Sequence, residues 1–182
     1  IEDECFRRDG NLQDEYTVVF DSLFKNAAAH RRVVEILATK RRGMTMAEIN
    51  HAFAPGSPKA SGTLVQILAH LCACGFAAKR APLFKERRGA LYTVADEFTL
   101  FSLKWVQGHR RHAGAGGVYT QSITSSPAYR SWCGFAFEML CLKHHEQVRT
   151  ALGLHKIAAT PGVFYACDPG TGSRTAQIDL LL

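Results

Sequence analysis

The sequence contains no long apolar run. Residues 98–106 come nearest, but they fall well short of the roughly 18 residues that cross a bilayer, and Lys104 interrupts them. The first ten residues, IEDECFRRDG, are acidic and lack the basic-then-apolar order of a secretory signal. These two absences predict a protein that has no membrane partner.

The six cysteines show no regular pair spacing, apart from Cys72 and Cys74. A disulfide scaffold or a structural zinc site would show closely and regularly spaced pairs, so both classes are disfavoured. All the cysteines except Cys5 and Cys167 fall in apolar segments with helical periodicity. We therefore expect reduced thiols in the core of a cytoplasmic protein.

The chain does have a basic body that follows an acidic start. Its 22 Lys+Arg and 16 Asp+Glu give a net charge of +6. Residues 1–25 hold seven acids and three bases, a net −4, so the remaining 157 residues carry +10. A basic body of this kind favours a polyanionic partner such as DNA, and the simpler interpretation is ordinary solvated surface charge.

The first half of the chain has the periodicity of short helices. Apolar spacing predicts an acidic, helical lead-in over residues 1–25, with its helix at 13–25, and a second helix over 27–40. Thr45-x-x-Glu48 is a capping box, which predicts a third helix up to about residue 54. Thr63-x-x-Gln66 has the same pattern and predicts a helix that stops at Gly75.

After Gly75 the pattern changes to that of two short strands, residues 76–83 and 90–94, joined by a charged hairpin tip. Asp96 and Glu97 then begin a trailing helix that extends to about residue 106. Three helices followed by a basic two-stranded ribbon are typical of a winged helix-turn-helix. The sequence therefore predicts this fold over residues 26–107.

In that arrangement the third of these helices, the one that begins at Thr63, faces the major groove of DNA, and the ribbon contacts the phosphate backbone. The side chains expected to bind nucleic acid are Lys59, Gln66, His70, Lys79, Arg80, Lys85, Arg87 and Arg88. Bases are read mainly by Arg, Asn and Gln, and the third helix offers few such side chains. We therefore expect mostly phosphate contacts, and many modules of this shape instead contact proteins.

Residues 108–125 combine glycine and charge without periodicity, which predicts a linker. Ser126-Pro127 then caps a helix predicted over residues 128–152, with two strands expected over 156–165 and 175–182. The fold class expected for the whole chain is α+β and mainly helical.

Two of the four acids in residues 98–182 lie where acids are disfavoured. Glu138 falls at the margin of an apolar helix face, and Asp179 lies within the apolar strand AQIDLLL. An unpaired buried carboxylate is costly, so such groups tend to pair or to bind a cation. One hypothesis is that the two carboxylates share one Mg²⁺. The alternative is an N–H-paired Asp at a strand end and a half-exposed Glu.

Two segments resemble the C-terminal region of prokaryotic (archaeal-type) AAA+/STAND-like ATPases: SPAYRSWCGFAFEMLCLKHHEQVRTALG and AQIDLLL. In that family a P-loop ATPase module precedes a winged helix and a PD-(D/E)XK nuclease-like domain. Three further segments are similar to the winged-helix part and the helix after it: NAAAHRRVVEILATKRRGMTMAEI, GTLVQILAHLCACGF and LYTVADEFTLFSLKWV. The resemblance covers nearly the whole chain from about Leu23.

The resemblance implies that Glu138 and Asp179 are catalytic and hold Mg²⁺ in the full-length parent. The E-x-K strand of the nuclease pattern would follow Leu182, and G-x-x-x-x-G-K-[ST] does not occur in the sequence. We therefore expect residues 126–182 to be a truncated nuclease-like domain.

The whole chain is then expected to be an interior fragment whose partner is the ATPase module of its own parent. Such a fragment would hold no cofactor tightly and would be inactive as an ATPase and as a nuclease. The alternative is a non-catalytic winged-helix DNA- or protein-binding regulatory module.

Overall fold

The computed structural model describes most of the chain: residues 2–7, 10–41, 43–57, 59–80, 90–108, 121–157, 162–167 and 174–181. The chain divides into two units, which are treated separately below. One comprises Ile1–Arg80 with Ala90–Tyr129, and the other comprises Ala81–Gly89 with Arg130–Leu182. The class is α+β and mostly helical, as the sequence predicts, with a small three-stranded antiparallel sheet.

The first unit begins with three helices: α1 (Glu2–Phe6), α2 (Glu15–Leu23) and α3 (Ala27–Ala38). The sequence predicts α2 and α3 but not α1, because five residues are too few to show a period. The side chain of Asn26 caps α3 by accepting a hydrogen bond from the Ala29 amide.

The predicted capping box of α4 (Met46–Phe53) is confirmed. The Thr45 hydroxyl accepts from the Glu48 amide, and the Glu48 carboxylate accepts from the Thr45 amide at 2.8 Å. Glu48 also accepts a hydrogen bond from Lys40 at 2.8 Å. The box therefore fixes both the start of α4 and its attachment to the end of α3.

The helix α5 (Gly62–Ala73) starts two residues earlier than its predicted capping box. Ser61, not Thr63, is the N-cap, and its hydroxyl accepts from the Leu64 amide. The Thr63-x-x-Gln66 prediction is therefore wrong, and Gln66 is an exposed side chain within the helix. Gly75, with φ of 79°, ends the segment as expected, because a left-handed residue terminates a helix most easily as glycine.

Three short strands form the sheet in the order β1-β3-β2: β1 (Met44–Thr45), β2 (Ala77–Arg80) and β3 (Leu91–Val94). Both pairings are antiparallel, with Met44 opposite Tyr92 and Lys79 opposite the same Tyr92. The sequence does not predict β1, since two residues carry no alternation. The predicted hairpin tip, residues 84–89, lies outside the described residues.

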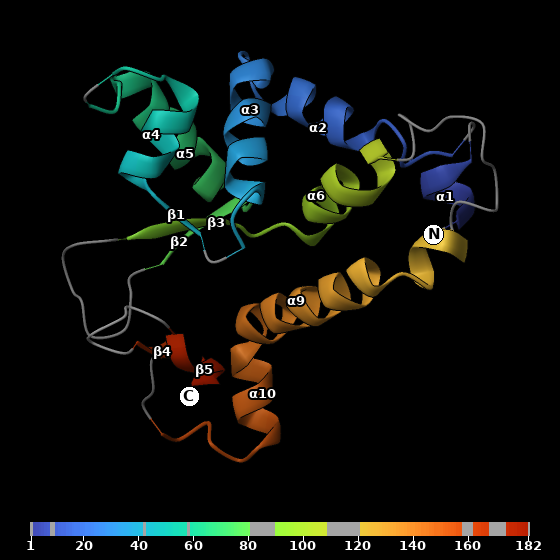
Figure 1. Ribbon diagram of the computed structural model, residues 1–182, viewed down its shortest axis with the longest axis vertical. Helices are drawn as coiled ribbons and strands as arrows, with labels where there is room; N and C mark the ends of the chain where they lie inside the picture. The colour runs from blue at the N-terminus through green and yellow to red at the C-terminus, as the bar shows by residue number, and fades with distance from the viewer. Residues whose placement is uncertain are drawn as a thin grey trace. The chain divides into compact units, whose positions relative to one another are not determined.

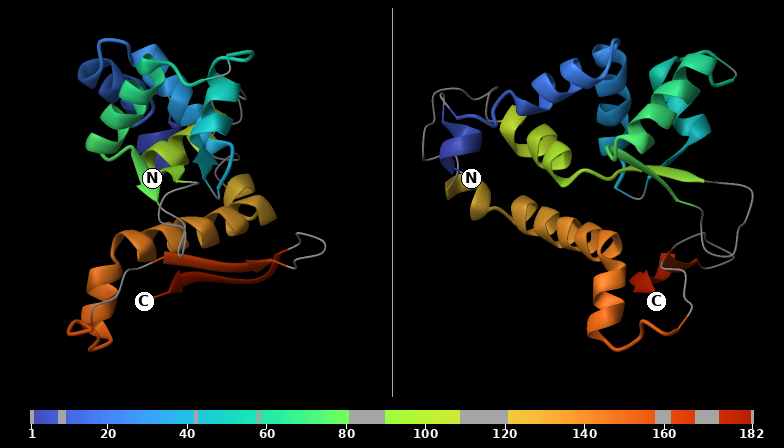
Figure 2. Two further views of the ribbon diagram at one scale, coloured as in Figure 1. Left: turned by 90° about the vertical axis from the view of Figure 1, so that its left-hand side faces the viewer. Right: turned by 180° about the vertical axis from the view of Figure 1, so that it is seen from behind.

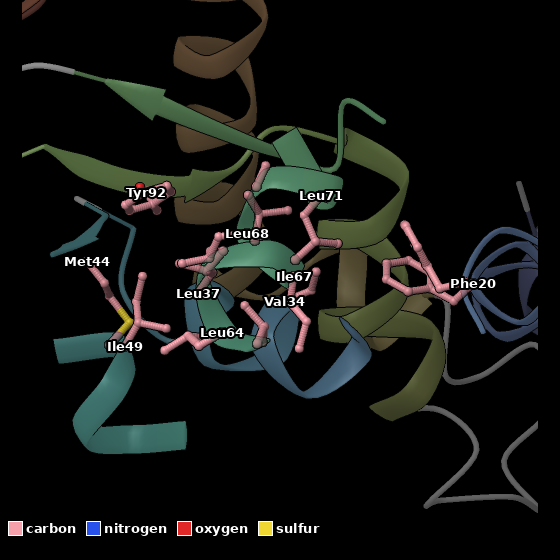
Figure 3. Packing of buried hydrophobic residues seen from close by; sticks show 14 of the residues in the cluster. Phe20, Val34, Leu37, Met44, Ile49, Leu64, Ile67, Leu68, Leu71 and Tyr92 are labelled. Carbon is pink, nitrogen blue, oxygen red and sulfur yellow. The ribbon is translucent and has the colours of Figure 1, made fainter. Parts of the chain in front are cut away.

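The core of this unit lies between the helices and the sheet (Figure 1). Figure 3 shows side chains from α3, α4 and α5 directed toward one another, with Met44 and Tyr92 at the sheet. Val34, Leu64 and Leu71 are completely buried. Burying each such side chain stabilises the fold by about 1.5–3 kcal/mol.

The trailing helix has two parts, α6 (Glu97–Phe101) and the π-helical turn η1 (Ser102–Val106). Asp96 caps α6 by accepting from the Thr99 amide, which agrees with the predicted start. Within the predicted linker, residues 121–124 are helical and Ile123 is buried.

The helix predicted over residues 128–152 is two helices, α9 (Pro127–Lys143) and α10 (His145–Ala151). The predicted N-cap of α9 is confirmed, since the Ser126 hydroxyl accepts a hydrogen bond from the Tyr129 amide at 3.1 Å. The break falls at His144, beside the contact between His145 Nδ1 and the Leu142 carbonyl at 3.0 Å. This side chain competes for a carbonyl that a continuous helix would use.

Two antiparallel strands complete the second unit, β4 (Gly162–Cys167) and β5 (Arg174–Leu181) (Figure 2). The range of β5 agrees closely with the predicted strand over 175–182. The strand predicted over 156–165 is only partly right, because β4 begins at Gly162 and residues 155–157 form a turn and a bend. The predicted turn at residues 168–170 is outside the described residues.

The expectation that the cysteines are core thiols holds only in part. The described cysteines are free, and Cys5 is buried, but Cys74 and Cys133 are exposed. Their helical periodicity alone does not show which face of the helix they occupy. Among the described residues, no helix is long and apolar enough to cross a bilayer.

Candidate functional site

The exposed face of α5 lies opposite its buried stripe. Leu64, Ile67, Leu68 and Leu71 point into the core, as the sequence predicts. Two side chains predicted to contact DNA, Gln66 and His70, therefore remain exposed one turn apart. The helix carries no Lys, Arg, Asp or Glu.

The basic side chains around α5 come from the segments before and after it. Lys59 is exposed two residues before the Ser61 cap. On β2, Lys79 is exposed with its ammonium 5.9 Å from the centre of the Tyr92 ring, and Arg80 is half-buried. Burial lowers the pKa of the Arg80 guanidinium, which nevertheless stays charged at neutral pH.

The structure thus describes five of the eight side chains predicted to bind nucleic acid, all on or beside α5 and β2. Lys85, Arg87 and Arg88 lie outside the described residues. The grouping follows from the sequence order of α5 and β2, which are joined by the short turn at Gly75.

His70 has a partner that sequence reasoning does not identify. Its Nδ1 lies 3.3 Å from Nε2 of His30, a residue of α3 that is only 5% exposed. The second nitrogen of His30, Nδ1, lies 2.8 Å from the Asn26 carbonyl. The His30 ring also stacks on Phe24, with centroids 4.0 Å apart. Forty positions separate the two histidines, so no local pattern connects them.

The ionised carboxylate of Glu48 holds the start of the neighbouring helix α4 in place. The hydrogen bond from Lys40, and then those from Thr45, hold the pKa of Glu48 at about 2, well below its usual value of 4.5. The ionised carboxylate therefore persists through the whole physiological range. It is a structural group, because its oxygens are occupied by the capping box and by Lys40.

The two carboxylates predicted to bind Mg²⁺ both lie in the second unit. Glu138 is half-buried on α9, and Asp179 lies on β5, where its side chain is outside the described part. Their proximity therefore stays a prediction. Within the described ranges, no three His, Cys, Asp or Glu side chains are grouped so that they could hold a metal ion.

Comparison of the chain with protein-family models, with curated proteins and with solved structures found no match. The functional argument therefore depends on the geometry of α5, β2 and the carboxylates alone.

Proposed function

We propose that the first unit is a winged helix-turn-helix module that associates with DNA through the phosphate backbone. The supporting observation is the element order α3-β1-α4-α5-β2-β3, with an antiparallel sheet in the order β1-β3-β2. A helix whose one face is buried presents its other face to a groove, and an adjoining ribbon reaches the phosphates.

Phosphate contact fits the side chains better than base reading does. The exposed face of α5 offers Gln66 and His70, whereas the cations Lys59, Lys79 and Arg80 flank the helix. Cations of this kind position a duplex without reading its sequence. The module should therefore bind DNA of any sequence with similar affinity.

For the second unit, we propose a nuclease-like role in a parent ATPase. A helix that carries the half-buried Glu138 precedes an antiparallel pair of strands, and Asp179 lies on the second strand. Two carboxylates are hard oxygen donors of the kind that Mg²⁺ prefers, so they would hold the ion in the full-length parent. Mg²⁺ there would polarise a phosphoryl oxygen and generate the attacking hydroxide.

The sequence contains neither E-x-K nor a P-loop pattern. We therefore propose that the 182 residues neither cut DNA nor hydrolyse ATP on their own. Mg²⁺-dependent cutting by the purified chain that disappears in Asp179→Ala would contradict this part of the proposal.

A protein-binding role is the rival function, and one observation favours it. Val65 is 48% exposed on α5, a helix without any charged side chain. An apolar exposed face suits a protein partner better than a polyanion. The two functions differ in their response to salt, because apolar contacts release no counterions.

Paired substitutions test the DNA-binding proposal. Lys59→Ala with Lys79→Ala removes two exposed cations, so the slope of log K against log salt should fall by about 1.8, roughly 0.9 for each lost contact. Lys25→Ala, an exposed lysine between α2 and α3, is the control and should leave the slope unchanged. An unchanged slope in the double variant would refute phosphate contacts at these positions.

A further inference from the structure

The hydrogen bonds of His30 and His70 determine which nitrogen of each ring carries a proton. The Asn26 carbonyl can only accept, so Nδ1 of His30 carries hydrogen. Nε2 of a neutral His30 is then a lone pair, and it faces Nδ1 of His70 at 3.3 Å. Nδ1 of His70 must therefore be the donor.

The ring geometry is consistent with this hydrogen bond. The two rings are within 4° of parallel, with centroids 5.6 Å apart. The centroids are farther apart than the two nitrogens by about the width of one ring, so the rings meet edge to edge rather than face to face. The facing nitrogens therefore share one proton.

Among the described residues, Nε2 of His70 is the remaining nitrogen of the pair and has no hydrogen-bond partner. His70 is exposed on the face of α5 that carries Gln66, whereas His30 is buried. In the neutral pair, Nε2 of His70 is a hydrogen-bond acceptor, which repels a phosphate oxygen. A proton added there turns it into a cationic donor and leaves the bonds to His30 and Asn26 intact.

On the elements that pack around the pair, Asp21 of α2 pairs with Arg31 of α3, Glu48 of α4 pairs with Lys40, and Lys79 of β2 lies over Tyr92 of β3. Lys25, Arg32 and Glu35, on or beside α3, are exposed to solvent. Cys74, one turn after His70, is a free, exposed thiol.

We propose that Nε2 of His70 is a proton-gated phosphate contact, whose protonation site and ring orientation are fixed by His30. The inference deepens the proposed DNA association and rests on it. A second proton placed between the rings, on Nε2 of His30, would point one N–H at the other N–H and break the hydrogen bond. The added proton therefore lies on Nε2 of His70, on the exposed face of α5.

DNA affinity measured against pH and salt tests the proposal. Between about pH 7.5 and about pH 5.5, the intact chain should bind a mixed-sequence duplex roughly five- to tenfold more tightly. The slope of log K against log salt should steepen by about 0.9, because one more counterion is released. His70→Gln should lose both effects. His51→Gln, which removes an exposed histidine of α4, should keep them.

The outcomes separate this inference from the function on which it rests. No binding at any pH overturns the DNA-binding proposal and with it the phosphate contact. Binding whose pH dependence survives in His70→Gln overturns the gated contact alone. Circular dichroism of His70→Gln should show the same secondary structure as the unmodified chain, and a fall in its thermal midpoint would report the lost hydrogen bond to His30.

Nitrogen-15 spectra of the histidine rings test the pair without DNA. Both neutral rings should be Nδ1–H tautomers, and acid should protonate Nε2 of His70 first. In His30→Gln, the His70 ring should become a mixture of tautomers. An Nε2–H tautomer for His30 in the unmodified chain would overturn the proposal.

Discussion

Glu48→Gln should destabilise the first unit by an amount that depends on pH. The carboxylate accepts from Lys40 at 2.8 Å and from the Thr45 amide at 2.8 Å, so it connects the end of α3 to the start of α4. A glutamine has the same shape but lacks the charge and one of the two acceptor oxygens. It can keep only one of these contacts at normal strength.

The magnitude follows from the pKa of Glu48. A fall from 4.5 to about 2 would correspond to roughly 3 kcal/mol in a fully buried site. The side chain is 33% exposed, so solvent screening reduces this figure to about 1–2 kcal/mol. Because the folded-state pKa is lowered, this stability is complete above pH 4.5 and is lost as the pH falls toward 2.

Urea unfolding at a series of pH values measures this effect. Glu48→Gln should be about 1–2 kcal/mol less stable than the unmodified chain at pH 7, and the difference should nearly vanish by about pH 2. Glu35→Gln, an exposed change on α3, should stay within about 0.5 kcal/mol at pH 7. A Glu48→Gln difference that is equal at both ends of the pH range would refute the role of the ionised carboxylate.

Three further predictions test the fold. Gly43→Ala should lower the thermal midpoint more than Gly56→Ala does. Both glycines have φ of 88°, but only at Gly43 would an added Cβ approach Thr93 Cγ2 to 2.8 Å. Leu68→Ala should cost about 2–5 kcal/mol in urea unfolding, since Leu68 is 1% exposed, and a loss below 1 kcal/mol would place it outside the core. Asp96→Ala should cost about 1 kcal/mol by removing the cap of α6, whereas Asp96→Asn should retain most of it.

Local sequence signals predict the helices of this chain and some of their ends. The Thr45–Glu48 box and the stop at Gly75 depend on residues within one turn, so they can be seen in the sequence. The cap of α5 shows the limit of such signals. Ser61 and Thr63 both suit an N-cap, and the sequence alone does not show that Ser61 is the one that caps the helix.

Contacts between distant segments are not visible in one sequence. The strand β1 exists only because Met44 pairs with Tyr92, and the His30–His70 contact requires α3 to pack on α5. His70 is therefore predicted only as a side chain that binds nucleic acid, whereas the structure shows one of its nitrogens already bound to His30. The carboxylates Glu138 and Asp179 raise the same problem, because their predicted meeting depends on how α9 packs.

Titration of the purified chain with a DNA duplex over a range of salt concentrations tests the central claim most directly. Contacts from the three described cations Lys59, Lys79 and Arg80 predict a slope of log K against log salt of about −2.7 or steeper. The affinity should be similar for unrelated sequences. A slope near zero, or no binding at low salt, would contradict the account and favour a protein partner for α5.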